Sequence, residues 1–459
     1  MILIGTQRGC TSRTISTHVV CLVKTAGVRH HSRLPTAAFA LHFVQRQRYS
    51  SSTVRNDRTA AIVVGAGPAG IAVVGNLLEN TKDGKIVWID PEFNGGRINK
   101  KYREVPGNTA VKLFVDYAKA VKPFQEIYET APKPNAVTVL EHEFPEQSGT
   151  CSLSYAGDML SFLTDGLKKH PRVQAVLAEA KSAQRDPVTK SWTLTTSVSS
   201  PQQPAAPLLV YCTGSHPTLA PLPTISAPSP TTLPLDTALT PSLLKDIIPS
   251  DCETTVAVIG GSHSAILVLM NLFSLATSDS HHPNLRVKWF TRSSTLTYAE
   301  PRDGYILNDN TGLKGRAAAF ARTQLDGDAL LSSPAGKVIT RVDCSGGKEK
   351  EWAQFEKELK VCAFVVHAVG YTRGEIPQTS VGVPKAGENK ELKVNPRTGA
   401  FEVDGKEVGL FGAGIAFPEE IDVPEGGGKT EYAVGMWKFM KFLRRVVPEW
   451  VQKTGAGGR

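Results

Sequence analysis

Two glycine-rich turns have the residue types and spacing that bind phosphate groups. The first, at residues 65–70, reads GAGPAG, and the second, at residues 260–265, reads GGSHSA. Glycines let the backbone approach a pyrophosphate closely, and the start of a following helix offers free N–H groups to its negative charge. The two turns therefore predict that one chain binds two dinucleotides.

The first turn lies between segments that would form a strand and a helix. The apolar run 60–64 is typical of a buried parallel strand, and residues 71–78 indicate a helix that packs back on it. The next predicted strand, 85–89, ends in Asp90, about twenty residues after the last glycine, where such units bind the ribose hydroxyls. The predicted contacts here are Gly65, Gly67, Pro68, Ala69, Gly70 and Asp90.

The second turn departs from the first in ways that bear on the cofactor. Ser262 and Ala265 replace the second and third glycines, but both are small, and the serine hydroxyl can donate to a phosphate. The following strand, 286–291, ends in Arg292 instead of an acid, which favours a ribose with a 2′-phosphate and so NADPH over NADH. A solvated surface arginine is the alternative. The predicted contacts are Gly260, Ser262, His263, Ser264, Ala265 and Arg292, with His263 near phosphate at the helix start and not a proton carrier.

Composition places the chain among ordinary globular proteins of more than one domain. It has 459 residues, of which 41% are hydrophobic and 21% charged. No uninterrupted apolar run is long enough to span a bilayer. Of the net charge of +9, eight charges lie in the first 56 residues, which contain no acid, and the remainder is close to neutral, so nothing predicts binding to nucleic acid.

The leader at residues 1–56 has the composition of a mitochondrial transit peptide. It is rich in arginine, serine and threonine, lacks acids, and resembles a matrix-protease cleavage site around Arg48 and Tyr49. We therefore expect a mitochondrial matrix protein whose mature chain begins near Ser50. A disordered extension is the alternative.

The seven cysteines make no CxxC or other close pair. A redox dithiol is therefore disfavoured as a route for electrons. The spacing of cysteine and histidine predicts no metal site.

These motifs resemble the flavoprotein reductases and monooxygenases with paired dinucleotide domains, including the flavin-containing and the ornithine or lysine N-hydroxylating monooxygenases. GAGPAG is similar to their FAD turn and GGSHSA to their NADPH turn. YCTGSHP at 211–217 and HAVGYTRG at 367–374 are similar to the two strand-ending crossings, and LFGAGIAFPE at 410–419 to the closing flavin-contact segment. The resemblance adds Thr213, Gly214, Gly370, Gly412 and Gly414 to the expected cofactor contacts.

The resemblance implies an α/β fold of two Rossmann-like three-layer domains, with the NADPH domain inserted in the FAD domain. We expect the leader at 1–56, the first part of the FAD domain at 57–253, the NADPH domain at 254–370 and the closing part at 371–459. A basic amphipathic helix at about 432–447 would cover the core with a solvated basic face, or alternatively lie on a membrane surface.

Residues 94–109 resemble the GG…Y…NT run that places an asparagine beside the flavin in flavin-containing monooxygenases. The run adds Gly96 and Arg97 to the cofactor contacts and makes Asn108 the candidate catalytic residue, whose amide would donate where oxygen reacts. An ordinary turn or helix cap is the alternative for this residue. The FxGxxxH signature is missing between residues 214 and 260, so the chain is a relative of these families and not an evident member of one.

Three functions follow from the sequence. The favoured one is an FAD enzyme that takes hydride from NADPH, passes electrons to oxygen and hydroxylates a small substrate. The second is a reductase that passes electrons to a quinone or a protein acceptor, and the third is a non-catalytic sensor or assembly protein that binds flavin or NADPH. The sequence names no substrate.

Overall fold

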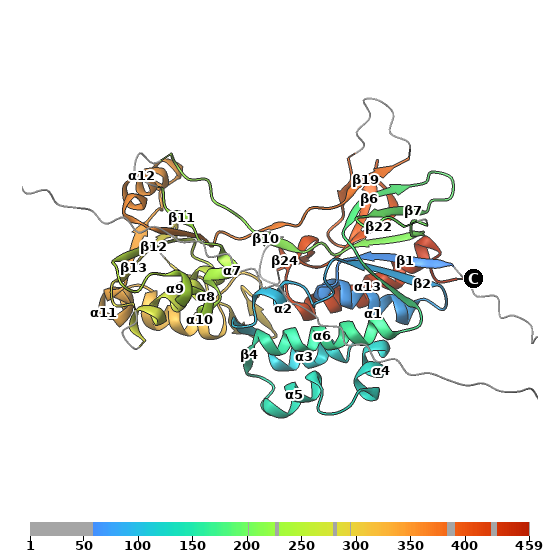
Figure 1. Ribbon diagram of the computed structural model, residues 1–459, viewed down its shortest axis with the longest axis horizontal. Helices are drawn as coiled ribbons and strands as arrows, with labels where there is room; N and C mark the ends of the chain where they lie inside the picture. The colour runs from blue at the N-terminus through green and yellow to red at the C-terminus, as the bar shows by residue number, and fades with distance from the viewer. Residues whose placement is uncertain are drawn as a thin grey trace, which may run out of the picture. The chain divides into compact units, whose positions relative to one another are not determined.

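The computed structural model describes residues 58–200, 202–224, 229–278, 282–293, 295–382, 391–423 and 429–458. The predicted leader and its cleavage site lie outside these residues. Two sheets organise the described chain, each with helices against it (Figure 1). The predicted α/β class is confirmed.

The first sheet carries the first glycine turn. Its seven strands run in the order β20-β21-β22-β9-β1-β2-β5, and the five from β22 to β5 are parallel. Side chains of β1 alternate between two cores, as the period of a strand requires. The strands are β1 (Thr59–Val64), β2 (Lys85–Asp90), β5 (Val173–Leu177), β9 (Leu208–Tyr211), β20 (Lys393–Val394), β21 (Ala400–Val403) and β22 (Lys406–Gly412).

Helices cover one face of the first sheet and a second, smaller sheet covers the other (Figure 1). The smaller sheet has the order β19-β6-β7-β8. The helices are α1 (Pro68–Asn80), α2 (Arg97–Lys101), α3 (Val111–Ala118), α4 (Lys122–Thr130), α5 (Ala136–Glu143), α6 (Leu153–Lys169) and α13 (Met436–Thr454). The strands are β6 (Ala180–Arg185), β7 (Trp192–Thr196), β8 (Ala205–Ala206) and β19 (Gln378–Val381).

The last helix, α13, packs against α1 and fills the first core. Its apolar side chains Met436, Phe439, Met440, Leu443 and Val447 are buried. These side chains are therefore not available to a membrane surface. The helix covers the core, as the first of the two predicted roles requires. In the described part of the chain, every helix is too short or too polar to cross a bilayer.

The second sheet carries the second glycine turn and is parallel throughout, in the order β11-β17-β12-β13-β16. It is built from chain that lies between β9 and β22 of the first sheet, so it is an insertion. Strand β11 joins it ahead of residue 254. The strands are β11 (Thr231–Thr232), β12 (Thr254–Ile259), β13 (Leu285–Thr291), β16 (Ile339–Asp343) and β17 (Phe364–His367).

Helix α9 packs on one face of the second sheet and α12 on the other (Figure 1). The helices are α7 (Leu235–Ala238), α8 (Pro241–Ile247), α9 (His263–Thr277), α10 (Gly315–Phe320), α11 (Ala329–Ser332) and α12 (Lys348–Glu358). Short helical turns follow at η1 (Ala321–Leu325), η2 (Pro334–Lys337), η3 (Leu359–Val361) and η4 (Gly414–Ala416).

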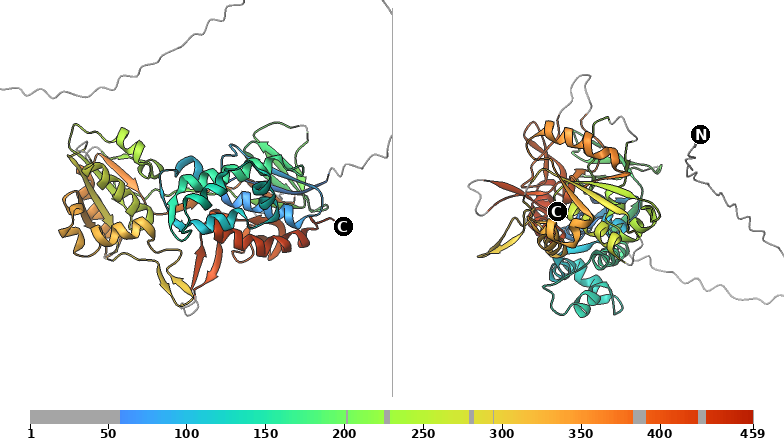
Figure 2. Two further views of the ribbon diagram at one scale, coloured as in Figure 1. Left: turned by 90° about the horizontal axis from the view of Figure 1, so that it is seen from below. Right: turned by 90° about the vertical axis from the view of Figure 1, so that its left-hand side faces the viewer.

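Paired short strands complete the fold. The antiparallel pair β10–β18 brings the two predicted crossing segments side by side, and β3 pairs with β4. The hairpins β14–β15 and β23–β24 project on the same side of the described chain (Figure 2), where Asn310 Nδ2 donates to Glu431 Oε2 at 3.0 Å. The strands are β3 (Pro106–Ala110), β4 (Thr150–Ser152), β10 (Ser215–Pro217), β14 (Glu300–Arg302), β15 (Tyr305–Leu307), β18 (Tyr371–Arg373), β23 (Glu419–Asp422) and β24 (Thr430–Ala433).

Candidate functional site

Two glycines of the first turn are required by close backbone contacts, one with the end of strand β9 and one within the turn. Gly65 has φ of +106°, and a Cβ there would lie 2.3 Å from the Cys212 carbonyl oxygen. A Cβ on Gly70 would lie 1.9 Å from the Gly65 carbonyl oxygen. Both contacts are with backbone, which cannot move aside. Gly70 therefore lets α1 pack closely on the turn, and Gly65 lets the turn pack closely on the end of β9.

Gly67 is different, because it faces open space. It is the N-cap of α1, with extended backbone at φ −80° and ψ −174°, and receives no side-chain cap. A Cβ on Gly67 would meet only the Gly96 Cα, at 3.9 Å. Pro68 has no N–H, so the free N–H groups at the start of α1 begin at Ala69, and no side chain caps them.

Two further predicted glycine segments close around the first turn. Gly96 has φ of +73°, and a Cβ on it would lie 2.8 Å from the Gly67 Cα. A Cβ on Gly414 would lie 2.4 Å from the Ala69 Cβ, and one on Gly412 would lie 2.4 Å from the Phe417 ring. The structure therefore brings residues 96 and 414 to the start of α1.

The Asp90 carboxylate holds the shape of the turn. Its Oδ2 accepts from the Ala66 N–H at 2.7 Å, and its Oδ1 accepts from the N–H groups of Glu92 at 2.8 Å and Phe93 at 2.7 Å. A carboxylate has about four lone-pair positions, so these three bonds leave room for a ribose hydroxyl. The turn-shaping bonds were not predicted from the sequence.

Asn108 lies in strand β3 with its side chain exposed. Helix α3 begins after Ala110, so the predicted alternative of a helix cap at Asn108 is wrong. Its Oδ1 accepts from the Thr109 hydroxyl at 3.3 Å, and its amide nitrogen has no bonding partner among the described residues. The Asn108 Cα lies 3.9 Å from where a Cβ on Gly315 would be, so the asparagine is next to the start of α10.

A polar cluster surrounds Arg97, the first residue of α2. Arg97 donates from Nη2 to Asp236 Oδ2 and from Nε to the Tyr102 hydroxyl, the latter at 3.3 Å. Tyr102 donates to Asp236 Oδ1 at 3.0 Å and shares a hydrogen bond of 3.2 Å with the Tyr371 hydroxyl. Burial, and next the neighbouring Tyr371, raise the pKa of Tyr102, which therefore stays protonated. The cluster joins α2 to α7 and β18.

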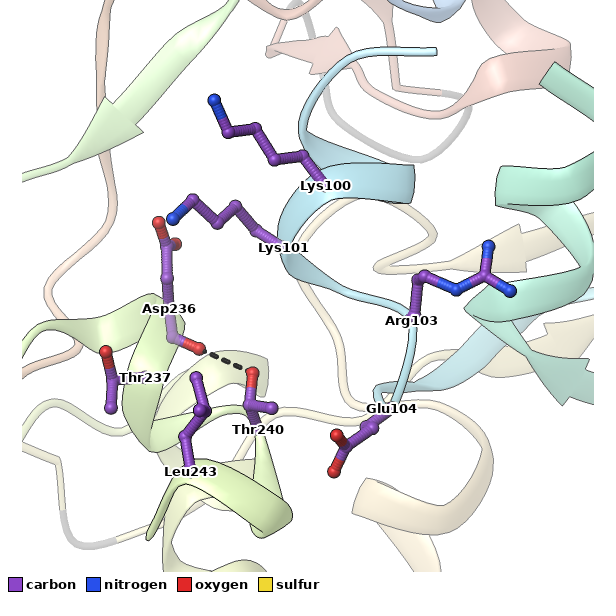
Figure 3. Close-up of a pocket in the computed structure, with 8 residues that line it drawn as sticks. All are labelled: Lys100, Lys101, Arg103, Glu104, Asp236, Thr237, Thr240 and Leu243. Carbon is purple, nitrogen blue, oxygen red and sulfur yellow. Dashed lines mark hydrogen bonds between the residues drawn. The ribbon is translucent and has the colours of Figure 1, made fainter. Parts of the chain in front are cut away.

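A small cavity of about 250 Å³ lies beside this cluster, at the end of α2 and next to α7 (Figure 3). Asp236 also contributes to it, and the Thr240 hydroxyl donates to the Asp236 carbonyl at 2.9 Å. Sites for drug-sized ligands occupy about 300–1,000 Å³, so this cavity is too small for a dinucleotide. Its lining residues are Lys100, Lys101, Arg103, Glu104, Asp236, Thr237, Thr240 and Leu243.

The second glycine turn repeats the close packing of the first. Gly260 has φ of +134°, and a Cβ there would lie 2.2 Å from the Ala368 carbonyl oxygen. A Cβ on Gly261 would lie 3.0 Å from Thr291 Oγ1. Ala265 is buried, whereas Ser262 is the exposed N-cap of α9 and its hydroxyl does not cap the helix. The hydroxyl and the first N–H groups of α9, near Ser264, therefore remain for a ligand.

A cavity of about 500 Å³ opens at the carboxyl ends of β12, β13 and β17. Strand β12 lies between β13, the next strand along the chain, and β17, a later one. The strand order therefore reverses at β12, and the cavity lies at this point, which is the usual position of a dinucleotide. Its lining includes Gly260, Ser262, Arg292, Thr297, Lys348, Glu351, Trp352 and Val369. The structure thus brings the second turn and Arg292 to one cavity.

Arg292 at this cavity is held by an acid that the sequence did not indicate. Its Nε donates to Glu351 Oε1 at 2.7 Å and its Nη2 to Glu351 Oε2 at 2.9 Å. The Arg292 side chain is 74% exposed, whereas that of Glu351 is only 9% exposed. Arg292 is therefore exposed, as in the alternative of a solvated surface arginine. Glu351 nevertheless holds its guanidinium, which lines the cavity.

His263 is the first residue of α9, and its Nδ1 is buried without a partner among the described residues. Burial, and next the positive charge of Lys314, lower its pKa to about 4. The imidazole is therefore neutral near pH 7. The position at the helix start is as predicted, whereas the absence of a proton-carrying role stays a prediction.

The remaining predicted residues lie in the paired crossing segments. Gly214 has φ of +70° and its carbonyl accepts from the Gly374 N–H at 2.8 Å, while the Thr213 hydroxyl donates to the Gly374 carbonyl at 3.4 Å. Gly370 has φ of +110° and accepts from the Thr218 N–H at 3.0 Å. These contacts hold the two segments together where the chain passes from the first sheet to the second and returns.

Cysteines and metals add no further site in the described chain. Cys151, Cys212, Cys252, Cys344 and Cys362 are all free thiols. No group of three or more His, Cys, Asp or Glu side chains among the described residues could hold a metal ion.

Comparison with known proteins gives one relative of high identity. No family model matches the chain. The monooxygenase AgnR1 from Paecilomyces divaricatus is 47% identical over 399 residues, which are 86% of this chain and 98% of that protein.

Two solved structures are similar in fold at low identity. The first is DfoA bound to FAD, a cadaverine monooxygenase of Erwinia amylovora, with a TM-score of 0.50 and 13% identity over 78% of this chain and 88% of that one. The second is the bacillithiol disulfide reductase Bdr of Staphylococcus aureus, with a TM-score of 0.48 and 12% identity over 86% of this chain and 99% of that one. Together with the identity to AgnR1 over nearly all of that protein, the two-turn α/β fold leads to one conclusion: the chain belongs to the same family of monooxygenases as AgnR1.

Proposed function

We propose that this monooxygenase is a flavoprotein that holds FAD at the first glycine turn and takes hydride from NADPH bound at the second. Electrons then pass to oxygen, and a small substrate is hydroxylated. The observation that carries the cofactor assignment is the pair of uncapped helix starts, at Gly67 and Ser262, each at the end of a central parallel strand. The identity to AgnR1 carries the reaction class.

FAD fits the first site. The start of α1 has no side-chain cap, and among the described residues only the Gly96 Cα comes within 4 Å of a Cβ placed on Gly67. Asp90 has capacity left for a ribose hydroxyl at the same edge of the sheet. In the solved structure of DfoA, a protein of similar fold, FAD is bound. When bound, FAD would supply the hydride acceptor and the centre that reacts with oxygen.

NADPH fits the second site. The cavity of about 500 Å³ is within the range of small-molecule sites, and it is lined by the turn, by Arg292 and by Lys348. Two cations at the edge where an adenosine ribose would lie favour a 2′-phosphate over a bare hydroxyl. We therefore assign this site to NADPH, with NADH as the weaker donor.

The chain's own residues would orient and protect the reaction. The Arg97 cluster fixes α2 against α7 and β18, so it sets the position of Gly96 beside the first turn. The protonated Tyr102 and the neutral His263 add no charge near pH 7. The Asn108 amide, which has no other described partner, would donate a hydrogen bond where oxygen reacts.

Substituting Asn108 by alanine should uncouple the oxygen reaction without preventing reduction. We expect anaerobic reduction by NADPH to stay within about twofold of wild type, while release of hydrogen peroxide per NADPH consumed rises about tenfold, because one preorganised donor is lost. Thr109→Ala is the matched control, since it removes a bond to Asn108 and leaves the amide in place. Unchanged coupling in Asn108→Ala would remove the asparagine from the mechanism.

We also propose that residues 1–56 direct the protein to the mitochondrial matrix. The acid-free, arginine-rich composition supports this. A fluorescent reporter fused to residues 1–56 should enter mitochondria and lose the leader. A reporter that stays in the cytosol would contradict the proposal.

A further inference from the structure

The Arg292–Glu351 pair joins the second sheet to helix α12 at the edge of the larger cavity. Arg292 directly follows β13, and Glu351 lies in the first turn of α12. Both residues line the cavity of about 500 Å³. A charged pair so placed can act on a ligand as well as on the fold.

The geometry of the pair leaves one edge of the guanidinium open. An arginine carries five N–H donors, and Glu351 takes two of them, from Nε and Nη2, at 2.7 and 2.9 Å. The remaining donors, two on Nη1 and one on Nη2, form the outer fork that binds a phosphate through two parallel bonds. Since 74% of the Arg292 side chain is exposed, this fork is accessible.

The acid is anchored more firmly than the arginine. Glu351 is nearly buried, at 9% side-chain exposure, so its carboxylate is a fixed point for the guanidinium. A long exposed arginine would otherwise lose rotamer freedom when it binds a ligand, which weakens binding. Because Glu351 already holds the guanidinium before a ligand binds, most of this loss of conformational entropy does not occur on binding.

Charge at the cavity still favours an anion. Glu351 neutralises Arg292, but Lys348, at the start of the same helix, also lines the cavity and makes no ion pair within the described chain. The ammonium of Lys348 and the N–H groups at the start of α12 therefore add positive potential beside the open fork.

We infer that Glu351 is a positioning residue that sets the preference for a 2′-phosphorylated adenosine by holding the Arg292 guanidinium with its outer fork open to the cavity. This inference rests on the proposed use of NADPH. Glu351 makes no contact with the ligand itself and acts through Arg292. The sequence gives no sign of this role, since the two residues are 59 positions apart.

The test is calorimetric titration of the full-length, FAD-loaded protein with 2′,5′-ADP and with 5′-AMP, which lacks the 2′-phosphate. In Glu351→Gln, the amide can accept only one of the two bonds from Arg292, so the guanidinium is no longer fixed. We expect affinity for 2′,5′-ADP to fall about five- to tenfold and affinity for 5′-AMP to stay within about twofold.

The matched control is Glu358→Gln on the same helix. Glu358 pairs with Lys288 of β13, with side-chain exposures of 19% and 22%, so it also ties α12 to the sheet, but it does not line the cavity. We expect its affinities for both probes to equal those of wild type. If Glu351→Gln folds poorly, Glu351→Asp keeps the charge but shortens the reach, and should lower only the affinity for 2′,5′-ADP.

The outcomes separate the two claims. If wild type binds 2′,5′-ADP no better than 5′-AMP, the proposed NADPH site is wrong and the inference fails with it. If wild type shows the preference but Glu351→Gln keeps it or increases it, Glu351 only anchors the helix or competes with the phosphate. That result would overturn the inference and leave the NADPH assignment intact.

Discussion

The Gly67→Ala protein is expected to fold like wild type and to bind FAD at least about 100-fold more weakly. Gly67 has backbone angles that alanine adopts freely, and a Cβ there would meet no described atom closer than the Gly96 Cα at 3.9 Å. Nothing in the fold therefore opposes the methyl group. The methyl would instead occupy the space over the uncapped start of α1, where the pyrophosphate must approach the backbone.

The measurement is FAD binding by the purified apoprotein, with thermal unfolding as the check on the fold. Gly149→Ala is the matched control, because a Cβ at Gly149 meets no atom within 4 Å and Gly149 directly precedes β4, outside the turn. It should keep wild-type affinity. Gly70→Ala should lower thermal stability as well, because its Cβ would lie 1.9 Å from the Gly65 carbonyl oxygen. Wild-type FAD affinity in Gly67→Ala would show that the pyrophosphate does not cross this helix start.

Arg292→Gln is expected to lower kcat/KM for NADPH by about 10- to 100-fold and to leave that for NADH within about twofold. Charge-assisted hydrogen bonds contribute about 1.5–3 kcal/mol, which corresponds to that loss. Glutamine was chosen because its amide can still donate to the buried Glu351 carboxylate. Alanine would leave that charge unpaired and destabilise the protein for a different reason.

Steady-state kinetics with both nicotinamide cofactors measures this effect. The matched control is Arg286→Gln in the same strand, β13, whose guanidinium donates to the carbonyls of Pro283 and Leu285 at the opposite end of the strand. Its ratio of NADPH to NADH efficiency should equal that of wild type. An unchanged ratio in Arg292→Gln would contradict the assignment of a 2′-phosphate to this arginine.

Local sequence patterns were enough to predict the two glycine turns and the strand and helix beside each. The strand, glycine turn and helix follow one another directly in the chain, whereas the carbonyls that exclude a Cβ at Gly65 and Gly260 belong to Cys212 and Ala368, far along the sequence. The continuous burial of β1 after Thr59 matches its apolar run, which is likewise a local property. The order of strand, turn and helix depends on residues close in sequence, so the sequence alone indicates it, but it does not indicate which distant carbonyl each glycine meets.

Contacts across the fold could not be predicted in this way. Glu351 meets Arg292 from 59 residues away, and Asp236 meets Arg97 from 139 residues away. A single sequence does not indicate which charged side chains pair when they are this far apart in the chain, because the fold decides which side chains meet. The helix-cap alternative at Asn108 was wrong for a related reason: pairing of β3 with β4 places the asparagine in a strand.

The last helix shows how a boundary is decided by its neighbours. A helix at about 432–447 was predicted, whereas α13 spans Met436–Thr454. Residues 430–433 are taken up by β24, which pairs with β23, and Gly435 has φ of +137° at the helix start. The helix continues past Pro448 because Trp450 and Val451 are buried in the first core.

The proposal that FAD passes electrons from NADPH to oxygen is tested most directly by stopped-flow spectroscopy of the FAD-loaded protein. The protein is reduced anaerobically with NADPH and then mixed with oxygen or with a quinone. We predict that NADPH reduces the flavin faster than NADH does, and that oxygen reoxidises it through a spectral intermediate that decays to oxidised flavin. A flavin that NADPH does not reduce, or that only a quinone or a protein acceptor reoxidises rapidly, would contradict the account.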